Sequence, residues 1–169
     1  MYNGAHVDIS NRKAGEMLAR LALENGAPMA KFDVAELLWP GCGHEQAMGS
    51  LYKVCSYIKH MHIATGVAVP LVSTRGELRL DMALIECDAR QFVQLCMTNH
   101  PMNWEKAVML YRGPLLAGDY FEWTSPWEAS FDMRYRDILK KLADCYKNLG
   151  NTIKSNYYRA KLDKSEGYF

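Results

Sequence analysis

Residues 44–80 read HEQAMGSLYKVCSYIKHMHIATGVAVPLVSTRGELRL, and two different periodicities meet within them. From position 44 to 64 apolar residues recur at three- and four-residue spacing, which predicts one long amphipathic helix. After Gly66 the pattern predicts a strand at 69–73, a glycine-containing turn at 74–77 and a second strand at 78–80. The stretch therefore predicts a helix followed directly by a β-hairpin.

Two shorter helices are predicted before this stretch. Residues 12–25 follow two candidate caps, Ser10 and Asn11, and stop before Gly26. Their apolar side chains share one helix face: Ala14, Met17, Leu18 and Leu21. Residues 31–38 carry a second amphipathic pattern, which ends at Trp39-Pro40. Three helices and a hairpin together predict a winged helix-turn-helix over residues 1–85.

The remainder of the chain is predicted to be helical, because apolar residues recur at helical spacing after residue 86 and no strand pattern is found there. The helical patterns cover 88–97, 103–111, 126–149 and 152–162 and are separated by short turns. Paired helices of this kind are typical of helical-repeat modules. We therefore expect a mainly α protein, in which residues 86–169 form an all-α, tetratricopeptide-like domain after the winged helix.

Composition limits the class of protein. Apolar residues make up 49% and charged residues 23% of the chain, which excludes intrinsic disorder. No run approaches the roughly 20 apolar residues of a membrane span, and the N-terminus lacks the pattern of a signal peptide, so we expect a cytoplasmic protein. The five cysteines include no Cys-x-x-Cys pair, and we expect reduced thiols.

Motifs of catalysis and metal binding are missing from the sequence. It contains no Gly-rich phosphate loop, no Gly-x-Ser-x-Gly elbow and no His-Glu-x-x-His. Cys42-x-His44 and His60-x-His62 lack the paired spacing of a structural zinc site. We expect no enzyme activity, no catalytic residues, no metal and no cofactor.

The net charge of +1 is unevenly distributed. Between Gln46 and Gly76 the chain has Lys53, Lys59 and Arg75 and no acidic residue. Advancing 100° per residue places a polar, mildly basic face opposite the apolar stripe of the predicted helix. Such a strip attracts phosphate even on a neutral protein, although an ordinary solvated surface has the same pattern.

Several motifs resemble those of a known family. Leu37-Leu38-Trp39-Pro40, followed by Ser50-Leu51 and Ile58-Lys59, is similar to the winged helix of SARP-type bacterial transcription regulators, which belongs to the OmpR/PhoB-type group. Tyr111-Arg112-Gly113-Pro114-Leu115-Leu116 resembles part of the bacterial transcriptional activator domain that follows this winged helix. The resemblance covers nearly the whole chain, and the two motifs stand in the family's order.

The resemblance implies a transcription activator that binds double-stranded promoter DNA in a sequence-specific manner. The helix at 44–64 would be the recognition helix in the major groove, and the hairpin tip would reach the adjacent minor groove or backbone. The helical domain would serve dimerisation or recruitment of RNA polymerase, and an upstream receiver or sensory domain of a two-component system would be a natural neighbour. The implied DNA-binding residues are Gln46, Ser50, Lys53, Ser56, Tyr57, Lys59, His60 and Arg75.

The chain departs from the family in two respects. The family's recognition helix is usually rich in arginine, where this chain has Tyr52, Tyr57, Lys59 and His60, so the bidentate contacts of arginine to guanine are missing. The family domain also opens with a small sheet, for which only Ala5–Ile9 could supply a strand, and we expect truncation there. The alternative is a protein-interaction module whose winged helix does not read DNA.

Overall fold

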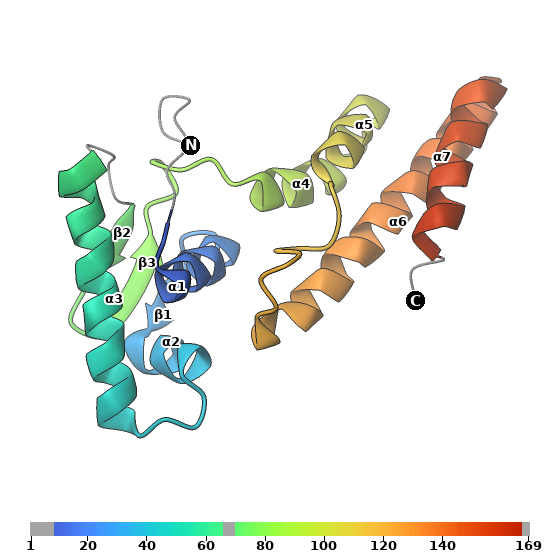
Figure 1. The fold of residues 1–169 in the computed structure, drawn as a ribbon. Helices are drawn as coiled ribbons and strands as arrows, with labels where there is room; N and C mark the ends of the chain where they lie inside the picture. The colour runs from blue at the N-terminus through green and yellow to red at the C-terminus, as the bar shows by residue number, and fades with distance from the viewer. Residues whose placement is uncertain (1–8, 66–69, 167–169) are drawn as a thin grey trace. The chain divides into compact units, whose positions relative to one another are not determined.

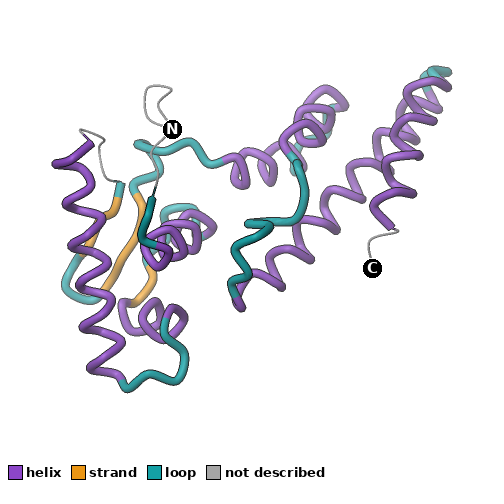
Figure 2. Tube along the Cα trace, in the orientation of Figure 1, coloured by secondary structure: helices purple, strands orange, loops and turns teal. Residues whose placement is uncertain are grey.

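The computed structural model describes residues 9–65 and 70–166 (Figure 1). The chain divides into two compact units, Met1–Cys87 and Asp88–Phe169. The described residues are mainly helical, and a small three-stranded antiparallel sheet lies in the first unit (Figure 2). None of the helices in these residues combines the length and hydrophobicity that a transmembrane helix requires. Apart from Ile9, the candidate strand at Ala5–Ile9 falls outside the described residues.

Three helices form most of the first unit. Helix α1 (Arg12–Leu23) begins at the predicted cap, where the side chain of Asn11 accepts a hydrogen bond of 3.1 Å from the amide of Ala14. It ends two residues before the predicted end, because Asn25 and Gly26 have φ angles of 55° and 87°, outside the helical region. Helix α2 spans Lys31–Leu38, and α3 spans His44–Thr65.

The predicted hairpin is present, and a third strand joins it. Strands β2 (Leu71–Ser73) and β3 (Glu77–Leu80) are antiparallel, with Ser73 opposite Leu78. Strand β1 (Met29–Ala30) pairs with the other edge of β3, which gives the order β1-β3-β2. Two residues are too few to show an alternating pattern in the sequence, and β1 was therefore not predicted.

The first unit has one hydrophobic core, to which all three helices and the hairpin contribute. Strand β3 alternates, with Leu78 and Leu80 buried and the residues between and before them exposed. Helix α3 contributes a continuous buried stripe of side chains: Ala47, Leu51, Val54, Cys55 and Ile58. Burial of this stripe stabilises the unit and determines which side of α3 faces solvent.

The second unit is built from helices alone among its described residues. Helix α4 (Asp88–Cys96) packs on α5 (Pro101–Leu110), and α5 packs on the long helix α6 (Ser125–Asn148), which follows a short 3₁₀ turn at Glu122–Thr124. Helix α7 (Thr152–Glu166) returns antiparallel along α6 after a tight turn at Gly150, whose φ is 72° (Figure 1). The elements thus form helical hairpins.

A carboxylate links three helices of this unit. One oxygen of Glu105 on α5 accepts hydrogen bonds from Tyr146 on α6 at 2.9 Å and from Lys154 and Tyr158 on α7 at 2.9 and 3.0 Å. The hydrogen bond from Lys154, assisted by those from the two tyrosines, holds the pKa of Glu105 below its ordinary value, against the opposing effect of burial. The ionised form of Glu105 therefore stabilises the packing of α5 on α6 and α7.

We predict that this unit loses stability as acid protonates Glu105. Because folding lowers its pKa, the stabilisation is fully present above the ordinary glutamate pKa of about 4.3 and is lost as pH falls through the folded-state value. Glu105→Gln should lower the midpoint of thermal unfolding by about 2–4 °C at pH 7. In scans from pH 7 to pH 3, this difference should shrink towards zero.

Asp137→Asn is the matched control. Asp137 pairs with Lys141 at 2.8 Å on the same helix, but its side chain is 57% exposed. The control variant should unfold within about 1 °C of wild type at neutral pH, because exposed pairs contribute little. A Glu105→Gln difference that stays constant from pH 7 to pH 3 would contradict the assigned role of the ionised carboxylate.

Candidate nucleic-acid interface

The side of α3 opposite its buried stripe is open to solvent. Lys53, Ser56 and His60 are exposed and follow one another at helical spacing along the centre of this side. Lys59 is exposed and lies on one flank of this row. Gln46, exposed, and Ser50, partly buried, lie on the other flank. Seven of the eight candidate residues thus belong to α3, and Arg75 lies in the exposed turn of the hairpin.

Three of the candidate residues already have hydrogen-bonding partners within the unit, since the hydroxyl of Ser56 also lies 3.3 Å from Nδ1 of His60. The hydroxyl of Tyr57 lies 3.0 Å from that of Ser10, just before α1, and Tyr57 is only partly exposed. The ring nitrogen Nδ1 of His60 lies 2.7 Å from the carbonyl oxygen of Ser56, and this carbonyl can only accept, so Nδ1 carries the proton. The Nε2 atom of His60 is then left as a hydrogen-bond acceptor when the ring is neutral.

The hairpin turn is fastened to the start of α2. The backbone amide of Lys31 donates a 2.8 Å hydrogen bond to the carbonyl of Gly76. The ammonium group of Lys31 donates to the carbonyl of Thr74 and lies 3.5 Å from that of Arg75. These bonds hold the turn by its backbone and leave the side chain of Arg75 exposed.

The turn also lies beside α3. The ammonium group of Lys31 is 5.4 Å from the centroid of the Tyr52 ring, which belongs to the same flank of α3 as Lys59. The turn that carries Arg75 therefore lies towards the flank of α3 that holds Tyr52 and Lys59. Exposed acidic residues, Glu45 and Glu77, stand only at the margins of this surface, at the start of α3 and after the turn.

Chemically, this surface suits an anionic partner better than a reaction. Burial raises the pKa of the Cys55 thiol in α3, so the thiol stays protonated near neutral pH and is a poor nucleophile. Among the described residues, no three His, Cys, Asp or Glu side chains gather where they could hold a metal ion. The surface instead carries the positive charges of lysine and arginine side chains, together with hydroxyl and imidazole groups that can form hydrogen bonds.

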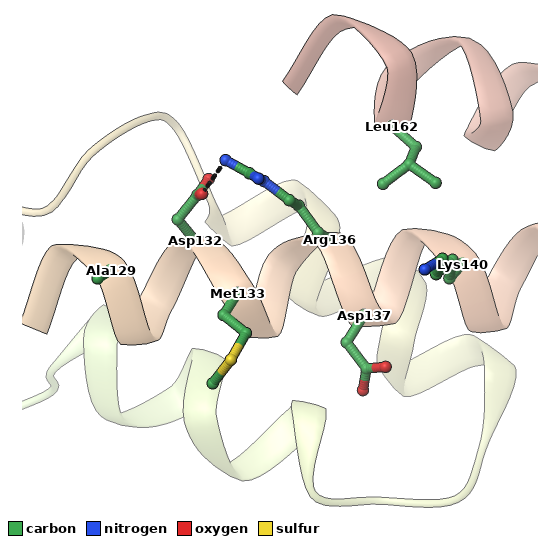
Figure 3. A pocket seen from close by; sticks show the side chains of 7 residues that line it. All are labelled: Ala129, Asp132, Met133, Arg136, Asp137, Lys140 and Leu162. Carbon is green, nitrogen blue, oxygen red and sulfur yellow. Dashed lines mark ion pairs between the residues drawn. The ribbon is translucent and has the colours of Figure 1, made fainter. Parts of the chain in front are cut away.

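Pockets in the second unit do not offer a comparable site. One, of about 480 Å³, lies along α6 and is bordered by Leu162 of α7 (Figure 3). Its Asp132 and Arg136 form an ion pair with each other, which leaves little net charge for a ligand. A second, of about 290 Å³, is lined largely by apolar side chains such as Phe92 and Phe131. Neither brings together groups suited to catalysis.

Comparison with known proteins adds no relative: no family model, no curated protein and no solved structure matches the chain. The assignment of this surface therefore depends on the geometry and charge of its residues.

Lys31 belongs to no pattern or motif of the sequence that indicates a functional role. It is 7% exposed, and it occupies the first position of α2. A lysine there is unfavourable, because the N-terminus of a helix carries partial positive charge. An unfavourable lysine at the predicted start of a helix indicates that its side chain makes a compensating contact elsewhere in the fold.

Gly49 lies near the centre of the exposed side of α3, and we predict that Gly49→Ala stabilises the first unit. A Cβ at this position meets no atom within 4 Å, and the residue is helical without a positive φ. Alanine reduces the conformational freedom of the unfolded chain and should increase the free energy of unfolding by about 0.5–1 kcal/mol, measured by urea denaturation.

Gly41→Ala provides a matched control, since a Cβ at Gly41 also meets no atom within 4 Å. Its φ of 76° is the difference, because alanine is strained in this region. We expect this variant to be destabilised by about 1 kcal/mol. The same sign of change in both variants would show that steric space, and not backbone conformation, decides the effect.

Proposed function

We propose that the first unit is a winged helix that binds double-stranded promoter DNA, and that the chain is part of a cytoplasmic bacterial transcription activator of the SARP type. In this proposal α3 is the recognition helix in the major groove and the β2–β3 hairpin is the wing. The single observation that carries it is the exposed side of α3, which has no acidic residue after Glu45, with a cationic hairpin tip fastened beside it.

The dimensions and chemistry of this surface support a duplex as the partner. An α-helix fits the major groove, and side chains that project from one of its faces reach the edges of the bases. Lys53, Ser56 and His60 project from the centre of that face. In this proposal Lys59 and Arg75, to one side, contact phosphates, which position a protein on DNA without reading its sequence. With few base-reading side chains, we expect binding that is weak or assisted by a partner.

The second unit supports a role in protein contacts. Its helical hairpins, α4–α5 and α6–α7, are consistent with a tetratricopeptide-like module, and such modules commonly bind peptides or partner helices. We propose that it contacts RNA polymerase or a second copy of the chain. The proposed role of the whole chain is regulatory, without a catalytic step.

A second candidate function is docking of a protein on the first unit without DNA binding. Phe32 on α2 and Tyr52 on α3 are 50% and 51% exposed, and exposed aromatic side chains are enriched at protein interfaces. The near-neutral net charge of the chain also favours this alternative. It predicts no mobility shift with any genomic fragment, even at low salt.

The test is duplex binding by the full chain, measured by fluorescence anisotropy at several salt concentrations. The double variant Lys53→Ala/Lys59→Ala should bind about tenfold more weakly at 0.1 M salt, and the slope of log K against log salt should fall by about two, because two cationic side chains no longer displace counterions from the duplex. Circular dichroism and thermal unfolding should match wild type, since both side chains are exposed.

Lys106→Ala/Lys140→Ala is the charge-matched control. Both lysines are exposed on helices of the second unit, so the variant has the same net charge as the test variant. Its affinity and salt slope should remain close to those of wild type. Equal losses in the two double variants would attribute binding to overall charge and would remove the case for α3 as the recognition helix.

A further inference from the structure

Lys31 is a buried cation whose position needs an explanation. It is 7% exposed, and its charge lies at the positive end of α2. A buried ammonium group is costly unless hydrogen bonds replace the lost water. Lys31 obtains them from backbone carbonyls of the hairpin turn, 43 and 44 residues further along the chain. Its side chain therefore joins two segments that are distant in sequence.

The turn itself shows why these carbonyls are available. In a closed four-residue turn, the carbonyl of the first residue accepts a hydrogen bond from the amide of the fourth. Here the amide of Glu77 instead donates to the hydroxyl of Thr74, at 3.2 Å. The carbonyl of Thr74 accepts from Lys31 in place of that amide. The amide of Thr74 donates to the carbonyl of Glu77 at 3.0 Å and closes the turn, and the ammonium group of Lys31 holds this closed turn by the carbonyl of Thr74.

Lys31 reaches the helix of the candidate interface as well. Its ammonium group lies 5.4 Å from the Tyr52 ring centroid, over a side chain of α3. Its backbone amide continues the pairing of β1 with β3 by donating to Gly76. One residue therefore contacts α3 and the turn that carries Arg75, and it begins α2.

We propose that Lys31 is a positioning residue for DNA binding: it fixes the turn at residues 74–77 beside α3, so that Arg75 and α3 contact one duplex together. This inference rests on the proposed function of the first unit. Lys31 itself is buried and touches no DNA in this proposal. Lys31 increases the affinity for DNA only because it positions Arg75.

The first experiment examines the turn without DNA. In the full chain, Lys31→Met removes the charge and the donors while keeping a long side chain. Amide signals of residues 74–77 in ¹H–¹⁵N spectra should shift, and hydrogen exchange of the hydrogen-bonded amides of Thr74 and Glu77 should become at least several-fold faster. Unchanged signals and exchange in these residues would overturn the proposal.

Lys13→Met is the matched control. Lys13 donates to the carbonyl of Leu38 at 2.6 Å and lies 5.9 Å from the Trp39 ring centroid, two contacts of the kinds that Lys31 makes, at a different place in the unit. It also pairs with the buried Glu16 at 2.8 Å, so Lys13→Met removes at least as many interactions as Lys31→Met and controls for a general loss of stability. It should leave the exchange of residues 74–77 relative to the rest of the unit unchanged. Equal acceleration in the two variants would attribute the effect to general loss of stability and would also overturn the proposal.

The second experiment is a double-mutant cycle on duplex affinity. Lys31→Met and Arg75→Ala should each weaken binding about fivefold, and the double variant should be no weaker than Arg75→Ala alone. Lys31→Met combined with Lys53→Ala should instead be additive. Additivity between Lys31→Met and Arg75→Ala would contradict an effect that passes through Arg75.

Two safeguards keep the outcomes separate. If Lys31→Met does not fold, Lys31→Gln takes its place, since it keeps a donor but has a shorter reach, and the same changes in residues 74–77 are expected. If the wild-type chain binds no duplex, the proposed function is wrong. The amide signals of residues 74–77 still show whether Lys31 fixes the position of the turn.

Discussion

Burial of one stripe of α3 is the constraint on which the first unit depends. Leu51 and Ile58 are almost fully enclosed by α1, α2 and the sheet, so α3 cannot rotate about its axis without exposing them. Rotation by half a turn would return large apolar side chains to water at a cost of several kcal/mol, on the order of 2 kcal/mol for each. The outward direction of Lys53 and His60 is therefore determined by the core. A surface fixed in this way is preorganised, and binding does not have to order it.

The two units use polar side chains in the same manner, although their folds differ. In the first, Lys31 joins a helix to a hairpin turn; in the second, Glu105 joins α5 to α6 and α7. In both, one charged group receives or supplies several hydrogen bonds at a junction of elements. Hydrophobic burial brings the elements together, and these charged groups fix their final placement.

The helices could be predicted from the sequence because apolar periodicity records them directly. The predicted starts at Lys31, His44 and Asp88 agree with the structure, the end of α2 at Leu38 agrees as well, and the ends of α3 and α4 differ by one residue. Strand β1 could not be predicted, since two residues carry no period. For the candidate interface, the exposed face of α3 follows from its periodicity, whereas Lys31 depends on contacts with residues 43 and 44 positions away. Long-range hydrogen bonds of this kind leave no local pattern.

The unusual closure of the hairpin turn also has an evolutionary consequence. The hydroxyl of Thr74 occupies the amide of Glu77, and Lys31 in turn occupies the carbonyl that this amide would have met. Without the lysine, the carbonyl of residue 74 returns to water or to the amide of residue 77; without the hydroxyl, that amide competes with the lysine for the same carbonyl. Positions 31 and 74 should therefore vary together among homologous sequences. Homologues without the hydroxyl at position 74 should also lack the lysine at position 31. In them the amide of residue 77 should donate directly to the carbonyl of residue 74.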